Sequence, residues 1–199
     1  MPAIKLDGKP DNSSDNYYYC DSQRTEGVLC PEFNVMQANL YSWRTTPYAC
    51  DAPSKKGFFS YCDTEAKCGV DQFYYPGYGP GDTIIDTYRP FHTKIDFNTD
   101  EGGETFKNYV VTLSQDDQTL VMDSATSSLC SDPSSLEAMS KDLAHNMAFS
   151  MSIGPTKSED WLQHGACDGT CGFGSLHKIS NIKIHTAFHV ETQSLIKTL

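Results

Sequence analysis

Residues 91–100 read FHTKIDFNTD, and this stretch decides the fold class because apolar and polar residues alternate along it. In an extended chain Phe91, Ile95 and Phe97 fall on one face, since successive side chains of a strand point to opposite faces. Similar strand patterns occur at 82–88, 106–113, 119–123, 146–154 and 178–184. Clusters rich in glycine and proline, such as YPGYGPGD at 75–82, separate the strands. This arrangement predicts an all-β antiparallel sandwich rather than a parallel α/β sheet.

One segment, residues 132–146, has helical rather than strand spacing. Leu136, Met139 and Leu143 recur there at intervals of three and four residues, which predicts one short helix. The chain of 199 residues is the size of a single domain. We expect a disordered lead-in at 1–16, a β-sandwich at 17–188 and a tail at 189–199.

The charge balance limits the possible partners. Asp and Glu number 26 against 15 Lys and Arg, which gives a formal net charge of -11. Such a chain repels phosphate backbones and anionic lipid surfaces, so we expect neither nucleic acid nor membrane as a partner. Neutral polymers remain possible, and we expect a monomer.

Eight dispersed cysteines indicate disulfides and therefore a secreted protein. The alternative is a zinc site, because His164, Cys167, Cys171 and His177 have ligand-like spacing. The residues between them, CDGTCGFG, are more typical of a cross-linked loop, so we expect no metal. The polar lead-in lacks the apolar segment of a signal peptide.

Residues 30–39, CPEFNVMQAN, suggest the chemistry. On a strand Glu32 and Asn34 point to the same face, whereas Gln37 points to the other unless a β-bulge restores its parity. Extended chain between positions 32 and 37 spans roughly 16 Å, so a curved strand is also needed to bring their side chains together. Paired carboxylates at this spacing suit a retaining glycosidase, and here two of the three positions carry amides.

An ordered series of motifs between residues 17 and 184 resembles glycoside hydrolase family 7, the fungal-type cellobiohydrolases and endoglucanases. The motifs are YCDSQ (19–23), CPEFNVMQAN (30–39), TPYAC (46–50), CDTEAKC (62–68), YGPGDTIIDT (78–87), SMSIG (150–154), DWL (160–162), GTC (169–171) and SNIKI (180–184). The resemblance corresponds to the C-terminal half of the family catalytic domain. It implies a concanavalin-like jelly roll with a groove for β-1,4-glucan or cello-oligosaccharides, cleaved with retention, and no cofactor.

The resemblance also implies roles for individual residues. Glu32 matches the nucleophile, Asn34 the orienting aspartate and Gln37 the general acid/base. Tyr48 stands where the family has a histidine, and Trp161 where it stacks a sugar, although a core tryptophan is the alternative. The implied disulfides are Cys20–Cys30, Cys50–Cys62, Cys68–Cys130 and Cys167–Cys171.

The substitutions leave three hypotheses. An amide cannot protonate a leaving alkoxide, so the first is a cellulase-type hydrolase impaired at Gln37. The second is a non-catalytic glucan-binding pseudoenzyme. The third is a packed strand whose polar residues, Glu32 included, simply face solvent.

Overall fold

The structure is a computed structural model that describes residues 20–24, 28–145, 147 and 162. The strands in these ranges are β1 (Glu32–Ala38), β2 (Trp43–Tyr48), β3 (Val70–Asp71), β4 (Tyr78–Gly79), β5 (Ile85–Asp86), β6 (His92–Thr99), β7 (Phe106–Gln115) and β8 (Gln118–Asp123). The helices are the 3-10 helix η1 (Gln72–Tyr74) and the α-helices α1 (Ser134–Ala138) and α2 (Ser140–His145).

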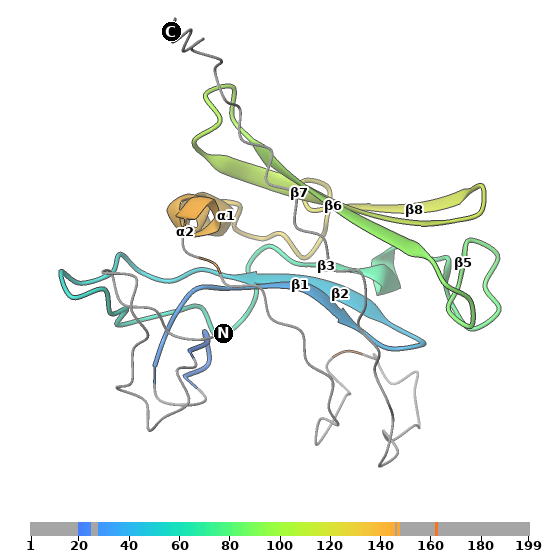
Figure 1. The fold of residues 1–199 in the computed structure, drawn as a ribbon, viewed down its shortest axis with the longest axis horizontal. Coiled ribbons are helices and arrows are strands. Elements are labelled where there is room, and N and C mark those ends of the chain that lie inside the picture. Colours follow the sequence, from blue (N-terminus) through green and yellow to red (C-terminus); the bar gives the residue numbers. More distant parts are fainter. Residues whose placement is uncertain (1–19, 25–27, 146, 148–161, 163–199) are drawn as a thin grey trace, which may run out of the picture.

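Two antiparallel sheets form two layers, as Figure 1 shows. One sheet has the order β1-β2-β3 and the other the order β6-β7-β8, while β4 and β5 form a small parallel pair. The described residues therefore confirm the predicted all-β sandwich.

The inner face of β7 shows why these residues form a half-buried strand. Tyr109, Val111 and Leu113 are all 0% exposed, and the residues between them are partly exposed. A register shift opposite Asn98 and Thr99 turns Phe106 to the same buried face as Tyr109. Burial of this apolar row between the sheets is the main stabilising contribution of β7.

Aromatic side chains and one hydroxyl join the two layers. The ring of Phe33 on β1 lies 5.1 Å from that of Phe97 and 5.2 Å from that of Tyr109, measured between centroids. The Tyr109 hydroxyl donates to the carbonyl oxygens of Cys68 at 2.9 Å and Thr45 at 3.2 Å. Phe33 thus points toward the core, so its neighbours on β1, Glu32 and Asn34, point to the opposite face.

The predicted helix at 132–146 is present as two consecutive short helices. Met139 separates them, and its backbone N–H bonds to the Leu136 carbonyl three residues earlier rather than four. The side chains of Leu136 and Met139 are both 0% exposed. The apolar spacing is therefore used for packing even though the helix is interrupted.

The segment 82–88, predicted as a strand, pairs only at β5. The carboxylate of Asp86 accepts hydrogen bonds from the backbone N–H groups of Gly81 at 2.7 Å and Tyr88 at 3.0 Å. These bonds hold the chain in turns on both sides of the short strand. Side-chain bonding to nearby backbone thus replaces an extended ladder.

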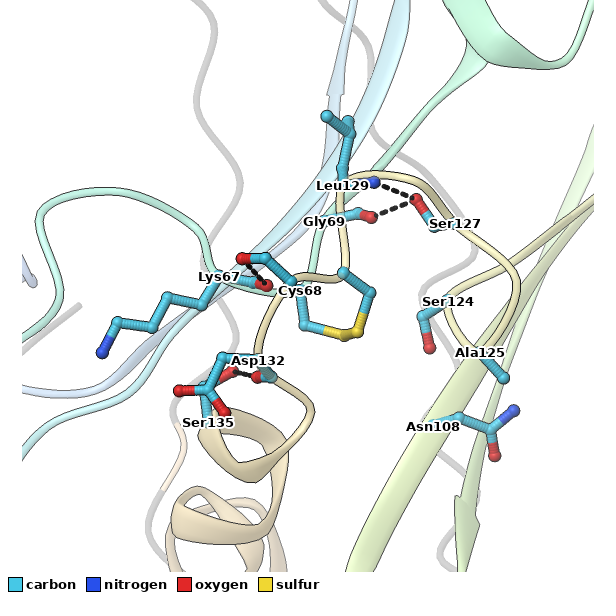
Figure 2. Close-up of a disulfide and its surroundings, with 12 residues drawn as sticks. Lys67, Cys68, Gly69, Asn108, Ser124, Ala125, Ser127, Leu129, Asp132 and Ser135 are labelled. Carbon is cyan, nitrogen blue, oxygen red and sulfur yellow. Dashed lines mark hydrogen bonds between the residues drawn. A yellow bond between two sulfur atoms is a disulfide. The ribbon is translucent and has the colours of Figure 1, made fainter.

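Three of the implied disulfides are present, Cys20–Cys30, Cys50–Cys62 and Cys68–Cys130. Figure 2 shows the third, which joins the start of the β3 segment to the loop before α1. Beside it the Ser127 hydroxyl donates to the Gly69 carbonyl at 2.8 Å and accepts from the Leu129 N–H at 3.2 Å. The bridge is therefore part of a hydrogen-bonded junction between the two segments.

Several expectations fall outside the described residues. These are the strands at 146–154 and 178–184, the Cys167–Cys171 disulfide, the zinc-like group, Trp161 and the segments 1–16 and 189–199. Within the described ranges, no helix has the length and apolar character needed to cross a bilayer.

Candidate active site

Strand β1 carries a β-bulge in the middle of the candidate catalytic stretch. Asn34 pairs with Thr46 on β2 and Gln37 pairs with Arg44, so three steps along β1 match two steps along β2. The extra residue turns Gln37 to the same face as Asn34 and Glu32. The bulge that Gln37 needs in order to share the face of Glu32 is thus present.

The apolar inner face of the sheet explains this arrangement. Trp43 and Thr45 on β2 are 0% exposed and point inward, as Phe33 does on β1. The Thr45 hydroxyl donates to the carbonyl oxygen of Val35 at 2.9 Å, within the bulge. This bond satisfies a backbone group that the bulge takes out of the regular ladder.

The outer face consequently presents polar side chains in cross-strand rows. Opposite residues of an antiparallel pair lie on the same face, so the rows are Glu32–Tyr48, Asn34–Thr46 and Gln37–Arg44. Tyr48 is half-buried beside the candidate nucleophile. Trp43 belongs to the core, where its ring contacts Tyr78.

Glu32 is held by Ser22, a residue for which the sequence suggested no role. Its Oε2 accepts hydrogen bonds from the backbone N–H and the hydroxyl of Ser22, both at 3.2 Å. Ser22 is 2% exposed and follows Cys20, whose disulfide to Cys30 ties this segment to the start of β1. Two donors from a cross-linked segment fix the direction in which the carboxylate points.

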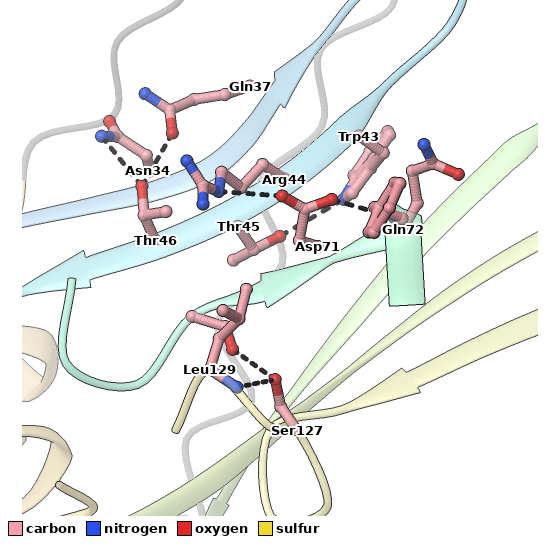
Figure 3. A network of polar contacts seen from close by, with 12 residues as sticks. Asn34, Gln37, Trp43, Arg44, Thr45, Thr46, Asp71, Gln72, Ser127 and Leu129 are labelled. Atoms are coloured by element: carbon pink, nitrogen blue, oxygen red, sulfur yellow. Dashed lines mark hydrogen bonds and ion pairs between the residues drawn. The ribbon is translucent and has the colours of Figure 1, made fainter. Parts of the chain in front are cut away.

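Asn34 and Gln37 are connected through the Thr46 hydroxyl (Figure 3). Thr46 Oγ1 donates to Gln37 Oε1 at 2.7 Å and accepts from Asn34 Nδ2 at a longer 3.4 Å. Asn34 thus hydrogen-bonds to Thr46. The role of Asn34 in orienting Glu32 stays a prediction. Thr46 itself is 2% exposed.

The row of Gln37 and Arg44 continues to Asp71 on β3, which forms an ion pair with Arg44. The Arg44 Nε lies 3.2 Å from Asp71 Oδ2, and the Asp71 side chain is 1% exposed. Asp71 also accepts from the backbone N–H of Phe73 at 2.9 Å, which caps η1. A carboxylate anchored in this way holds the guanidinium beside the position of Gln37.

The sequence did not single out three residues of the site: Thr46 and Arg44 on β2, and Ser22, which contacts Glu32. Ser22 and Thr46 lie inside the quoted motifs YCDSQ and TPYAC, so position in a motif was the available signal. Arg44 had none, because its pairing depends on strand register.

A pocket of about 290 Å³ lies elsewhere, between β6, β7 and α2. Phe97, Phe106 and Leu143 contribute to its wall, and none of Glu32, Asn34 and Gln37 does. The polar rows on β1 and β2 are therefore a separate feature.

Comparison with known proteins relates the chain to an endoglucanase. No family model matches the chain. The chain is 29% identical over 199 aligned positions to Endoglucanase EG-1 of Trichoderma longibrachiatum. The alignment covers 85% of this chain and 41% of the relative, so the chain spans well under half the length of that protein.

Proposed function

From the relation to glycoside hydrolase family 7 that the similarity to Endoglucanase EG-1 supports, we propose a cellulase-type glycoside hydrolase site acting on β-1,4-glucan. Glu32 is the nucleophile of a retaining mechanism, and hydrolysis is impaired because Gln37 occupies the acid/base position. The observation that carries this proposal is the bulge that turns Gln37 to the face of Glu32 and Asn34.

The chemistry follows from the two side chains. In a retaining mechanism a Glu32 oxygen attacks the anomeric carbon while the glycosidic bond breaks and the leaving oxygen takes a proton. The Gln37 amide has no acidic proton to give, so an unactivated sugar alkoxide leaves slowly. An aryloxide with a low pKa leaves without that proton, so Glu32 can still be glycosylated by an activated substrate.

The setting suits a neutral ligand outside the cell. A net charge of -11 does not oppose binding of an uncharged glucan. We propose Tyr48, in the row of Glu32, and Trp161 as sugar contacts. Three disulfides among the described residues accord with a secreted protein, and we propose that it is a monomer.

A second candidate is a glucan-binding protein without catalysis. The specific observation in its favour is that both amides are engaged with a nearly buried hydroxyl, which suits a fixed hydrogen-bonding surface. Glycan binding is common to the two candidates, and covalent chemistry separates them.

Glycan binding is tested by titrating cellotetraose into the protein by calorimetry. We expect saturable binding in the micromolar to millimolar range together with a raised melting temperature, because a ligand that binds only the folded state stabilises it. Glu32→Gln should retain most of this binding. No heat and no thermal shift at millimolar cellotetraose would contradict both candidates.

Covalent chemistry is tested with 2,4-dinitrophenyl β-cellobioside. The wild-type protein should release a burst of dinitrophenolate close to one equivalent, followed by slow turnover, because glycosylation needs no acid whereas the amide cannot activate water for deglycosylation. Glu32→Gln should abolish the burst. Glu137→Gln, the same change at an exposed carboxylate on α1, should leave it intact.

The same assay separates the two candidates. If wild-type protein binds cellotetraose but shows neither a burst nor turnover, the non-catalytic candidate is correct. If Glu32→Gln releases dinitrophenolate as wild type does, Glu32 is not the nucleophile.

A further inference from the structure

We propose that Thr46 is a positioning residue that turns the Gln37 amide so that its nitrogen, not its oxygen, is offered to the ligand. The site then presents a neutral hydrogen-bond donor where an acid would transfer a proton. The identity of the ligand, a β-glucan, rests on the proposed function. The orientation of the amide rests on the hydrogen bonds alone.

The direction of the hydrogen-bond chain follows from the single proton of the hydroxyl. Thr46 Oγ1 uses that proton toward Gln37 Oε1 at 2.7 Å, and its lone pairs accept from Asn34 Nδ2 at 3.4 Å. The amide oxygen of Gln37 is therefore occupied, and the two protons on its nitrogen are directed elsewhere. Figure 3 shows that nitrogen pointing away from Thr46.

Burial and the bulge make this orientation specific. Thr46 is 2% exposed, and a buried hydroxyl keeps its hydrogen-bond partners because solvent cannot replace them. Its χ1 is restricted by β-branching, so the hydroxyl has few alternative directions. Thr46 lies directly across from Asn34, and the bulge places Gln37 diagonally within its reach.

An amide N–H on this face recognises oxygen lone pairs. A sugar hydroxyl, a ring oxygen or a glycosidic oxygen is the complementary group, and each is uncharged. Among the residues that the structure describes, the charged and titratable groups on the same outer face are Glu32, Tyr48, Arg44 and the Asp71 that pairs with Arg44. Neither partner of the Thr46–Gln37 bond is ionisable, so that bond itself is independent of pH.

Side-chain amide hydrogen exchange, measured by NMR without any ligand, tests the direction of the chain. In wild-type protein we expect the Asn34 amide protons to exchange more slowly than those of Gln37. Thr46→Val should accelerate exchange at Asn34, and Thr46→Ser should restore the wild-type rate. Slower exchange at Gln37 than at Asn34 in wild type would reverse the chain and overturn the proposal.

Cellotetraose affinity tests the consequence for the ligand. Thr46→Val should weaken binding by about 3- to 10-fold, the loss expected for one misdirected neutral hydrogen bond, while Thr46→Ser stays near wild type. Equal weakening in the two variants would point to packing instead and overturn the positioning role. If wild type binds no cellotetraose, the glucan function fails, and the exchange rates still decide the orientation of the amide.

A pH profile gives a readout that a purely structural threonine would not move. In Gln37→Glu the Thr46 hydroxyl would donate to the new carboxylate, which favours the charged form and lowers its pKa. Because the acid must be protonated for the first step, the alkaline limb of kcat/KM marks that pKa. The limb should lie at higher pH in Gln37→Glu with Thr46→Val than in Gln37→Glu alone. If the alkaline limb lies at the same pH in both variants, Thr46 does not hydrogen-bond to the side chain at position 37, and the proposal is wrong.

Discussion

Gln37→Glu is expected to hydrolyse a soluble β-glucan at least about 100-fold faster than the wild-type protein, since general acid–base catalysis contributes 10²–10⁴-fold. The bulge already places position 37 on the face of Glu32, so the new carboxyl needs no rearrangement of the backbone. It would protonate the leaving oxygen in the first step and take a proton from water in the second. Release of reducing ends measures the rate.

The control for this gain is Gln118→Glu, which makes the same amide-to-carboxylate change at an exposed position on β8. It should leave hydrolysis at the wild-type level. Adding Glu32→Gln to Gln37→Glu should remove the gain, because an acid without a nucleophile cannot form the glycosyl intermediate. A Gln37→Glu rate equal to wild type would show that Gln37 does not limit hydrolysis.

Removal of the Cys68–Cys130 bridge by paired alanine substitutions is expected to lower the free energy of unfolding by about 4 kcal/mol. The two cysteines are 62 residues apart, so the bridge restricts a long loop in the unfolded chain. Cys68 is also 0% exposed, and truncating it leaves a gap in the core. Urea denaturation followed by tryptophan fluorescence measures the change.

Paired alanine substitutions at Cys50 and Cys62 provide the comparison. Their separation is 12 residues, so the expected loss is smaller, about 3 kcal/mol. An equal or larger loss at the shorter loop would show that local packing, not loop length, sets the contribution of these bridges.

The alternating strands could be predicted from the sequence because their apolar side chains share one face. That face is buried in β7 and β8, whereas the residues of β6 are only partly buried or exposed. β7 is the clearest case, with Tyr109, Val111 and Leu113 inside. The segment 82–88 also contains apolar residues, Ile84 and Ile85, but is fixed in turns by Asp86, and such side-chain bonds to backbone leave little trace in periodicity. The break at Met139 is equally invisible, since Leu136 and Met139 are buried in either conformation.

The candidate site was predictable in part. Spacing alone placed Glu32 and Asn34 together, but the face of Gln37 depended on a bulge that the sequence could not locate. In the structure, the bulge is accompanied by the inward packing of Phe33 and by the hydrogen bond from the Thr45 hydroxyl to the Val35 carbonyl. Ser22 and Thr46 contact β1 from other segments of the chain, so these contacts could be identified only from the three-dimensional structure.

A crystal structure of Glu32→Gln with cellotetraose bound would show whether the outer face of β1 and β2 is the glucan site. We expect glucosyl units across the outer face of β1 and β2, with Gln37 Nε2 donating to a sugar oxygen and an anomeric carbon next to position 32. A well-defined oligosaccharide elsewhere, for example in the pocket between β6, β7 and α2, with the rows of Glu32 and Gln37 uncontacted, would contradict this expectation.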